Sequence, residues 1–229
     1  MLILASNSPR RRQLLALGGW TFQVRPVEVD ETPTPAEDPR LYVLRLAECK
    51  ARAAAARAEA DAIYQDAIFQ DAIFVAADTT VADGNRILGK PRDAVEAGRM
   101  LRSLRGRTHQ VYTALAVFRP PTGTLLTDWC LTEVPMRAYS DEEMQAYIAS
   151  GDPLDKAGAY AIQHAGFRPV EKLTGCYANV MGLPLCHLTR TLAKLGLEPG
   201  VAIAQACQAE LAYPCPVYQQ VLRPEEAVN

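Results

Sequence analysis

Short apolar runs alternate with segments that carry helix signals, and this alternation limits the possible fold more than any other feature of the sequence. An apolar run at residues 2–5 leads into a helix pattern that contains Leu14, Leu15 and Leu17. Residues 22–29 then alternate between apolar and polar side chains, which is typical of a strand. Pro26 places this strand at a sheet edge or a bulge, because proline has no N–H to donate.

Capping signals define the helices that follow. Asp38 and Pro39 predict a helix start, with Asp as the N-cap and Pro at the first helical position, and the helix continues to residue 59. Asp93 and Glu96 form a capping-box pattern for a helix that ends at Gly106. Similar signals predict helices over residues 140–151 and 184–195.

Further strands are expected between these helices. A buried strand at residues 73–77 is closed by Asp78, a hairpin has strands at 111–119 and 125–134, and a short strand ends at Gln163. Helices that alternate with both hairpins and isolated strands indicate an α/β fold, with a mixed twisted sheet flanked by helices. The residues beyond Pro199 are expected to form a loosely attached C-terminal extension, residues 200–229, with no assigned function.

Composition excludes several functional classes. The chain has 229 residues with 24 Lys and Arg against 26 Asp and Glu, so it lacks the basic field that drives nonspecific nucleic-acid binding. No stretch approaches the roughly 18 to 20 apolar residues of a membrane span, and the N-terminus lacks the basic region of a signal peptide. The six cysteines form no Cys-x-x-Cys pair. These features predict a cytoplasmic protein with reduced thiols and no zinc site, and they argue against nucleic-acid and membrane partners.

A pentapeptide occurs three times in succession, at residues 61–65, 66–70 and 71–75. Three such units are too few for a repeat architecture. We expect the third unit to enter the buried strand, and the first two to be an insertion, near residues 61–72, that lengthens the preceding helix or loop. An interaction motif is the alternative interpretation, and a neutral insertion is favoured over it.

The junction between the first strand and the first helix carries Ser6, Ser8, Arg10 and Arg11. Unpaired amides of the first helical turn, hydroxyls and guanidiniums in one place are the composition of a polyphosphate site. A Ser-capped helix with solvated arginines explains the same residues equally well. The segment is not a Walker A loop, because it lacks the glycine-rich run and the Gly-Lys-Ser/Thr ending.

Two acidic positions could hold a divalent cation. Asp78 follows an apolar strand, and Glu31, beside Asp30, follows the second strand in the same way. Carboxylates near bound phosphates favour Mg²⁺ or Mn²⁺, which prefer oxygen ligands. The alternatives are a turn cap for Asp78 and a solvated surface charge for Glu31.

Two lysines could neutralise phosphate oxygens. Lys50 lies in a largely apolar helix, and Lys90 is held between a glycine and a proline in a tight turn. A snorkelling or solvated lysine is the alternative for each of them. The three histidines are far apart in the sequence and lack triad or metal spacing, so covalent catalysis is not indicated.

Several separated motifs occur in one order along most of the chain. They are residues 4–11, 30–31, 50–51, 77–79, 89–91, 155–163 and 177–184. Together they closely resemble the motifs of the Maf family of nucleoside triphosphate pyrophosphatases, over about residues 1–196. The resemblance implies a Maf-like domain at residues 1–199, with two lobes and a central nucleotide groove, similar to inosine triphosphate pyrophosphatases.

The resemblance also implies an activity. It implies hydrolysis of dTTP and UTP to the monophosphate and pyrophosphate, by metal-assisted attack of water at the α-phosphate, with Mg²⁺ or Mn²⁺ as cofactor. By match to the family motifs, Asp78 is the catalytic base, while Arg10, Thr79 and Gln163 mark the preference for the base. A homodimer, removal of modified nucleotides and a role in cell-division arrest are further expectations from the family.

Two positions depart from the family pattern. Ala161 and His164 stand beside Gln163 where glycines are usual, which bears on base selectivity more than on catalysis. Two alternatives to this activity stay open. One is a pyrophosphatase for 7-methyl-GTP or other noncanonical nucleotides, and the other is a non-catalytic nucleotide-binding regulator of septum formation.

Overall fold

The computed structural model describes residues 1–61 and 71–223. Within these residues the strands form a six-stranded sheet in the order β2-β1-β3-β5-β6, with β4 paired to β3. The strands are β1 (Leu2–Leu4), β2 (Phe22–Val24), β3 (Ile73–Asp83), β4 (Arg86–Leu88), β5 (Thr108–Arg119) and β6 (Thr124–Pro135). β1 pairs in parallel with β2 and β3, and the other pairs are antiparallel. The predicted α/β fold with a mixed sheet is confirmed.

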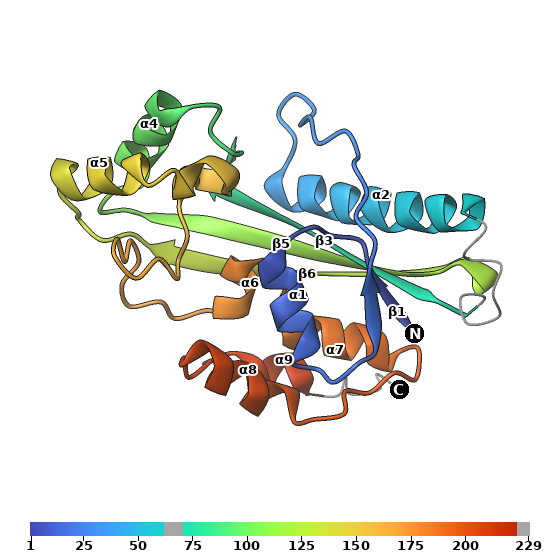
Figure 1. The fold of residues 1–229 in the computed structure, drawn as a ribbon. Helices are drawn as coiled ribbons and strands as arrows, with labels where there is room; N and C mark the ends of the chain where they lie inside the picture. The colour runs from blue at the N-terminus through green and yellow to red at the C-terminus, as the bar shows by residue number, and fades with distance from the viewer. Residues whose placement is uncertain (62–70, 224–229) are drawn as a thin grey trace.

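Helices cover both faces of this sheet (Figure 1). They are α1 (Pro9–Ala16), α2 (Pro39–Ala60), α4 (Ala94–Leu104), α5 (Asp141–Ala149), α6 (Tyr177–Met181), α7 (Leu185–Ala193), α8 (Ile203–Leu211) and α9 (Tyr218–Leu222). The long helix α2 lies on one face, and α1, α6 and α7 lie on the other, while α4 and α5 gather at one end of the long strands. The helices predicted from caps begin where expected, because side-chain capping by Asp38, Asp93 and Ser140 is decided locally.

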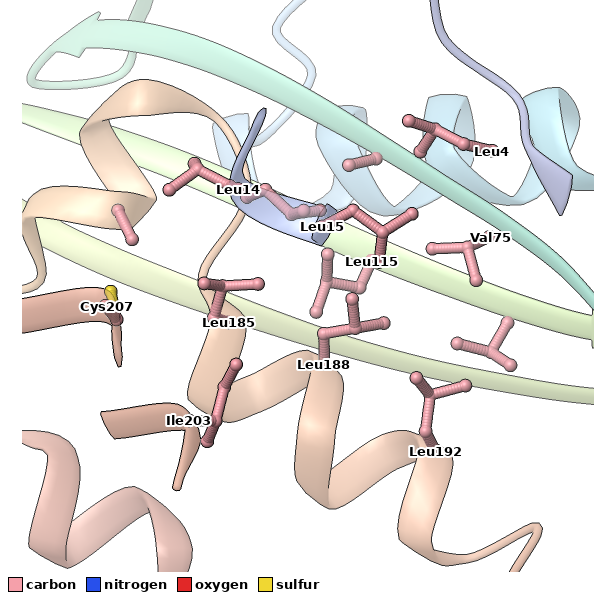
Figure 2. Close-up of a cluster of buried hydrophobic side chains, with 14 of the residues drawn as sticks. Leu4, Leu14, Leu15, Val75, Leu115, Leu185, Leu188, Leu192, Ile203 and Cys207 are labelled. Carbon is pink, nitrogen blue, oxygen red and sulfur yellow. The ribbon is translucent and has the colours of Figure 1, made fainter. Parts of the chain in front are cut away.

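Side-chain alternation along β3 separates two hydrophobic cores. Phe74 and Ala76 pack toward α2, while Val75 and Ala77 pack toward α7 on the opposite face. The α2 side is rich in alanine on both the helix and the strands, so the helix backbone can approach the sheet closely. The α7 side is filled by larger residues (Figure 2), among them Leu115.

The same long strands carry another core at their far ends. Val81, Val111 and Val134, from β3, β5 and β6, pack with buried residues of α4 and α5. This third core and the two cores around α1 and α2 therefore lie at different ends of shared strands (Figure 1). Between the two ends, β3 pairs with β5 along one edge but has no paired strand along its other edge within the described residues.

Two predicted strands end five or more residues away from the observed ends. β2 ends at Val24 instead of residue 29. Arg25 N still donates a hydrogen bond to Leu4 O at 2.9 Å. The pairing stops there because Pro26 has no N–H to donate. β3 is longer than predicted, and Asp78 lies inside it instead of closing it, since its neighbours pair with β5 and the strand turns into β4 only at Gly84. The turn at Gly84 has a positive φ of 61°, which glycine adopts without strain.

The short strand expected to end at Gln163 is absent from the described residues. Residues Ala157–Ala159 form a 3-10 turn, and Gly158 and Ala159 both have positive φ values, 69° and 62°. Left-handed residues cannot continue an extended strand, so this segment is a loop. Two further 3-10 turns, Asp152–Asp155 and Pro120–Thr122, precede this loop and close the β5–β6 hairpin, respectively.

The expectation of a loosely attached tail is wrong for the part that the structure describes. Ile203 and Cys207, one turn apart on α8, are buried beside Leu185 and Leu188 of α7 (Figure 2). Burial of one apolar face explains why α8 packs on the domain. The division of the chain at residue 199 stays a prediction.

Only part of the pentapeptide repeat lies within the described residues. The first two units span residues 61–70 and, apart from Asp61, lie outside the described residues, whereas the third unit enters β3 at Ile73 as predicted. Among the described helices, none combines the length and the apolar character that crossing a membrane requires.

Candidate active site

The site forms beside the stretch of β3 that has no paired strand on one edge. β1 pairs with β3 up to Val75, and β4 pairs with β3 only from Val81 onward. Among the described residues, this register leaves Asp78 and Thr79 without a paired strand on that side. Because successive strand residues face opposite sides, both side chains reach the open edge from different faces of the sheet.

A cavity of about 610 Å³ opens at this edge. Its walls come from the start of α1, the loop before α2, the middle of β3, the turn after β4 and the loop after α5. Every site residue predicted from the sequence lines it: Ser6, Ser8, Arg10, Arg11, Glu31, Lys50, Asp78, Thr79, Lys90 and Gln163. Residues separated by more than 150 positions are thus brought to one place by the fold.

The start of α1 lines the cavity. Ser8 is the N-cap, its side chain accepts a hydrogen bond from Arg11 N at 3.4 Å, and Pro9 occupies the first turn. The serine cap considered from the sequence is therefore correct. The solvated arginines of that alternative are not, because Arg10 is half-buried and lines the cavity and Arg11 donates hydrogen bonds to three protein groups.

Arg11 joins three separate segments. Its Nε donates to Gly182 O at 2.8 Å, Nη1 donates to Ser6 Oγ at 3.3 Å, and Nη2 donates to Thr79 Oγ1 at 3.0 Å. Burial lowers the pKa of Arg11, and the charge of Asp78 opposes this effect. Arginine stays protonated over the physiological range, so the cavity holds a fixed positive charge beside the buried Asp78.

Lys50 holds two carboxylates together. Its Nζ lies 2.6 Å from Asp78 Oδ1 and 2.5 Å from Glu31 Oε1. Lys50 and Asp78 are both buried, whereas Glu31 is exposed. The snorkelling alternative for Lys50 is excluded, because its ammonium is directed at the two acids and not at solvent.

The two carboxylates have opposite pKa shifts. Burial raises the pKa of Asp78, and the charges of Lys50 and Arg11 offset part of that rise. Burial would also raise the pKa of Glu31, but the hydrogen bond and charge of Lys50, with the charges of Lys90 and Arg11, outweigh it and lower the pKa. The arrangement thus contains one carboxylate that holds its proton more tightly than usual and one that stays ionised, the pattern of an acid–base site.

The remaining predicted residues lie at the rim. Lys90 and Gln163 are exposed, and the turn that carries Lys90 is tied to the opposite loop by a hydrogen bond from Gly158 N to Gly89 O at 3.1 Å. Of the two positions that depart from the family pattern, Ala161 lines the cavity. His164 packs against the ring of Tyr147, with centroids 4.7 Å apart, and does not line it.

Comparison with known proteins agrees with this geometry. A family model described as Maf-like protein matches residues 1–195. The chain belongs to the Maf family. A dTTP/UTP pyrophosphatase of Anaeromyxobacter dehalogenans (strain 2CP-1 / ATCC BAA-258) is 45% identical over 197 residues, which cover 85% of this chain and 94% of the relative. Proteins of the same name from Myxococcus xanthus (strain DK1622) and Geobacter sp. (strain M21) are 47% and 43% identical, covering 86% and 85% of this chain and 93% and 95% of the relatives.

The Maf fold also brings to the cavity a residue that sequence reasoning had not assigned. Lys156 is buried, and its Nζ donates to Asp152 O at 2.8 Å and to Asp155 Oδ1 at 2.6 Å. The adjacent Asp155 and Lys156 in a glycine-rich segment were the available signal. Their ion pair orients the lysine along the cavity wall.

The sequence analysis did not predict the hydrogen-bonded chain behind Thr79, although Thr79 and Asn179 stand in the motifs at residues 77–79 and 177–184. Thr79 Oγ1 lies 2.9 Å from Thr113 Oγ1, and Thr113 Oγ1 donates to Asn179 O at 2.9 Å. Asn179 Nδ2 in turn donates to Val111 O and to Thr132 Oγ1. These residues come from β3, β5, β6 and α6, so only the folded Maf chain brings them together.

Proposed function

We propose that this Maf-family chain hydrolyses dTTP and UTP to the nucleoside monophosphate and pyrophosphate. The observation that carries the proposal is the convergence of Arg10, Lys50 and Lys90 with two carboxylates in one cavity. A triphosphate tail has several negative charges, and a confined set of cations stabilises it. The relatives named dTTP/UTP pyrophosphatase, which match most of this chain at 43 to 47% identity, support the choice of substrate.

In this proposal Asp78 is the base. A water molecule attacks the α-phosphorus, the bond from that phosphorus to the bridging oxygen breaks, and pyrophosphate leaves, while the proton of the water passes to an Asp78 oxygen. A carboxylate whose pKa is raised by burial is a stronger base than an exposed one. Lys50 holds Asp78 in place and limits the rise of its pKa.

The other residues bind and orient. The N-terminus of α1, with Ser6, Ser8 and Arg10, receives the phosphates, because a helix N-terminus favours negative charge. Lys90 closes the opposite rim, and Arg11, held by three protein groups, supplies fixed positive charge. Thr79 and Gln163 face the nucleobase, where an amide can both donate and accept hydrogen bonds.

Glu31 and Asp78 suit a divalent cation, Mg²⁺ or Mn²⁺. The described residues include no group of three or more acidic, histidine or cysteine side chains placed to bind a metal. The carboxylates of Glu31 and Asp78 nevertheless lie close together, because both contact Lys50 Nζ. Oxygen ligands from two carboxylates and a substrate phosphate match the preference of these ions. The ion supplies neutralisation of phosphate charge when it is bound.

The test is pyrophosphate release from a panel of canonical and modified triphosphates, with and without Mg²⁺ or Mn²⁺. We expect dTTP and UTP to be the best substrates, and Asp78→Asn to abolish turnover while the thermal unfolding midpoint changes little, because the side chains are nearly isosteric. Preference for 7-methyl-GTP would replace the proposed substrate. Binding of dTTP without turnover in the wild type would favour a regulator.

A further inference from the structure

Protons in the chain behind Thr79 can be assigned by counting donors. The backbone carbonyl oxygen of Asn179 can only accept a hydrogen bond, so its 2.9 Å contact with Thr113 Oγ1 uses the single hydroxyl proton of Thr113. Thr113 then has no proton left for its 2.9 Å contact with Thr79. The proton in that second contact must therefore come from Thr79.

Thr79 consequently faces the cavity without a donor. Its proton points at Thr113, inside the sheet, and one of its lone pairs accepts from Arg11 Nη2 at 3.0 Å. One lone pair remains, and Thr79 lines the cavity. We infer that Thr113 is a positioning residue that makes Thr79 an obligate hydrogen-bond acceptor toward the ligand.

Such an acceptor selects between pyrimidine rings. Uracil and thymine carry an N–H at ring position 3, which can donate to Thr79, whereas cytosine has an unprotonated nitrogen there and would place two acceptors together. This inference rests on the proposed function, because it takes the nucleobase to be the group that meets Thr79. The fixed proton direction then gives the preference for uracil and thymine over cytosine a physical cause.

Thr113 is suited to this role by its surroundings. It is fully buried in β5 directly across from Thr79 in the strand register, so no solvent molecule competes for its hydroxyl. Replacement by valine keeps the shape but removes the acceptor, which frees the Thr79 proton to turn toward the cavity. Serine at the same position keeps the oxygen and should keep the proton order.

The test compares three variants by binding. Dissociation constants are measured for the α,β-methylene analogues of UTP and CTP with wild type, Thr113→Val, Thr113→Ser and Thr132→Val. Thr132 is the matched control, because it is a buried threonine that bonds to the same Asn179 and Cys176 segment without touching Thr79. Pyrophosphate release from UTP is measured separately.

We expect Thr113→Val to reduce the preference for the UTP analogue over the CTP analogue roughly 3- to 10-fold, the worth of one hydrogen bond. Thr113→Ser and Thr132→Val should keep the wild-type ratio within about twofold. Equal weakening of both analogues by Thr113→Val, an equal change in Thr132→Val, or a wild type without preference would overturn the inference. The expected change in binding ratio for Thr113→Val could also be found in a protein whose wild type releases no pyrophosphate. That result would overturn the proposed reaction but would support this inference.

Discussion

Removal of the Lys50 ammonium should move the pH dependence of the reaction. In Lys50→Met the side chain keeps its length, but Asp78 and Glu31 lose the cation that contacts both of them. The side chains of Lys50 and Asp78 are only 11% and 8% exposed, so water replaces little of the lost interaction. Asp78 is then left beside a second carboxylate, and both changes favour its protonated form.

The size of the effect follows from the contact. An opposite charge at this range lowers a carboxyl pKa by roughly one to three pH units, equivalent to about 1.4 to 4 kcal/mol. In a plot of kcat/KM for UTP against pH, the fall in activity on the acidic side reports the pKa of the catalytic base in the free enzyme. We call this part of the profile the acidic limb, and it exists because a base must be deprotonated to act. The limb should therefore shift to higher pH by about one to three units in Lys50→Met, and the activity lost near pH 7 should return in alkaline buffer.

Two variants serve as controls for this measurement. Lys50→Arg keeps the charge beside Asp78 and should leave the limb close to its wild-type position. Lys90→Met removes an exposed lysine from the same cavity and should raise KM without moving the limb. If Lys50→Met and wild type show the same acidic limb, then either Lys50 does not set the pKa of the base or Asp78 is not that base.

Three further outcomes can be measured. Arg10→Ala should raise the barrier measured by kcat/KM by about 1.5 to 3 kcal/mol, the worth of a charge-assisted contact, and an unchanged kcat/KM would exclude Arg10 from phosphate binding. Ile203→Ala should lower the free energy of unfolding, measured in urea, by about 2 to 5 kcal/mol, because Ile203 is buried. Val201→Ala, at an exposed position, should lower it by less than about 0.5 kcal/mol. Burial lowers the pKa of His109 to about 4, so between the unfolded value near 6.5 and pH 4 only the unfolded chain gains the proton, and stability falls as pH falls. The wild type should thus lose about 3 kcal/mol more than His109→Asn between pH 7 and 4, and parallel urea-unfolding curves would contradict a neutral buried imidazole.

Local chemistry made much of the fold predictable. The N-caps Ser8, Asp38 and Asp93 satisfy amides within their own turn, so helix starts can be read from neighbouring residues. The positions of these elements were therefore available without knowledge of distant residues.

Strand length and tail packing were not local properties. β3 continues past Asp78 because β5 supplies partners along its whole length, and nothing near Asp78 in the sequence shows that pairing. Likewise α8 is held by contacts of Ile203 with a helix that precedes it in the chain, while Pro199 suggested an end to the domain. Both errors come from long-range burial and hydrogen bonding, which outweigh local signals.

The sequence by itself determined which residue types were available to a nucleotide site, since charged groups such as Arg10, Lys50 and Asp78 stood in motifs that resemble one family. Only the tertiary structure decided how they interact: that one ammonium joins two acids, and that Thr113 orients the proton of Thr79. The physical reason is that pKa values and proton directions depend on distances of about 3 Å between atoms from different elements, and chain order alone does not set those distances.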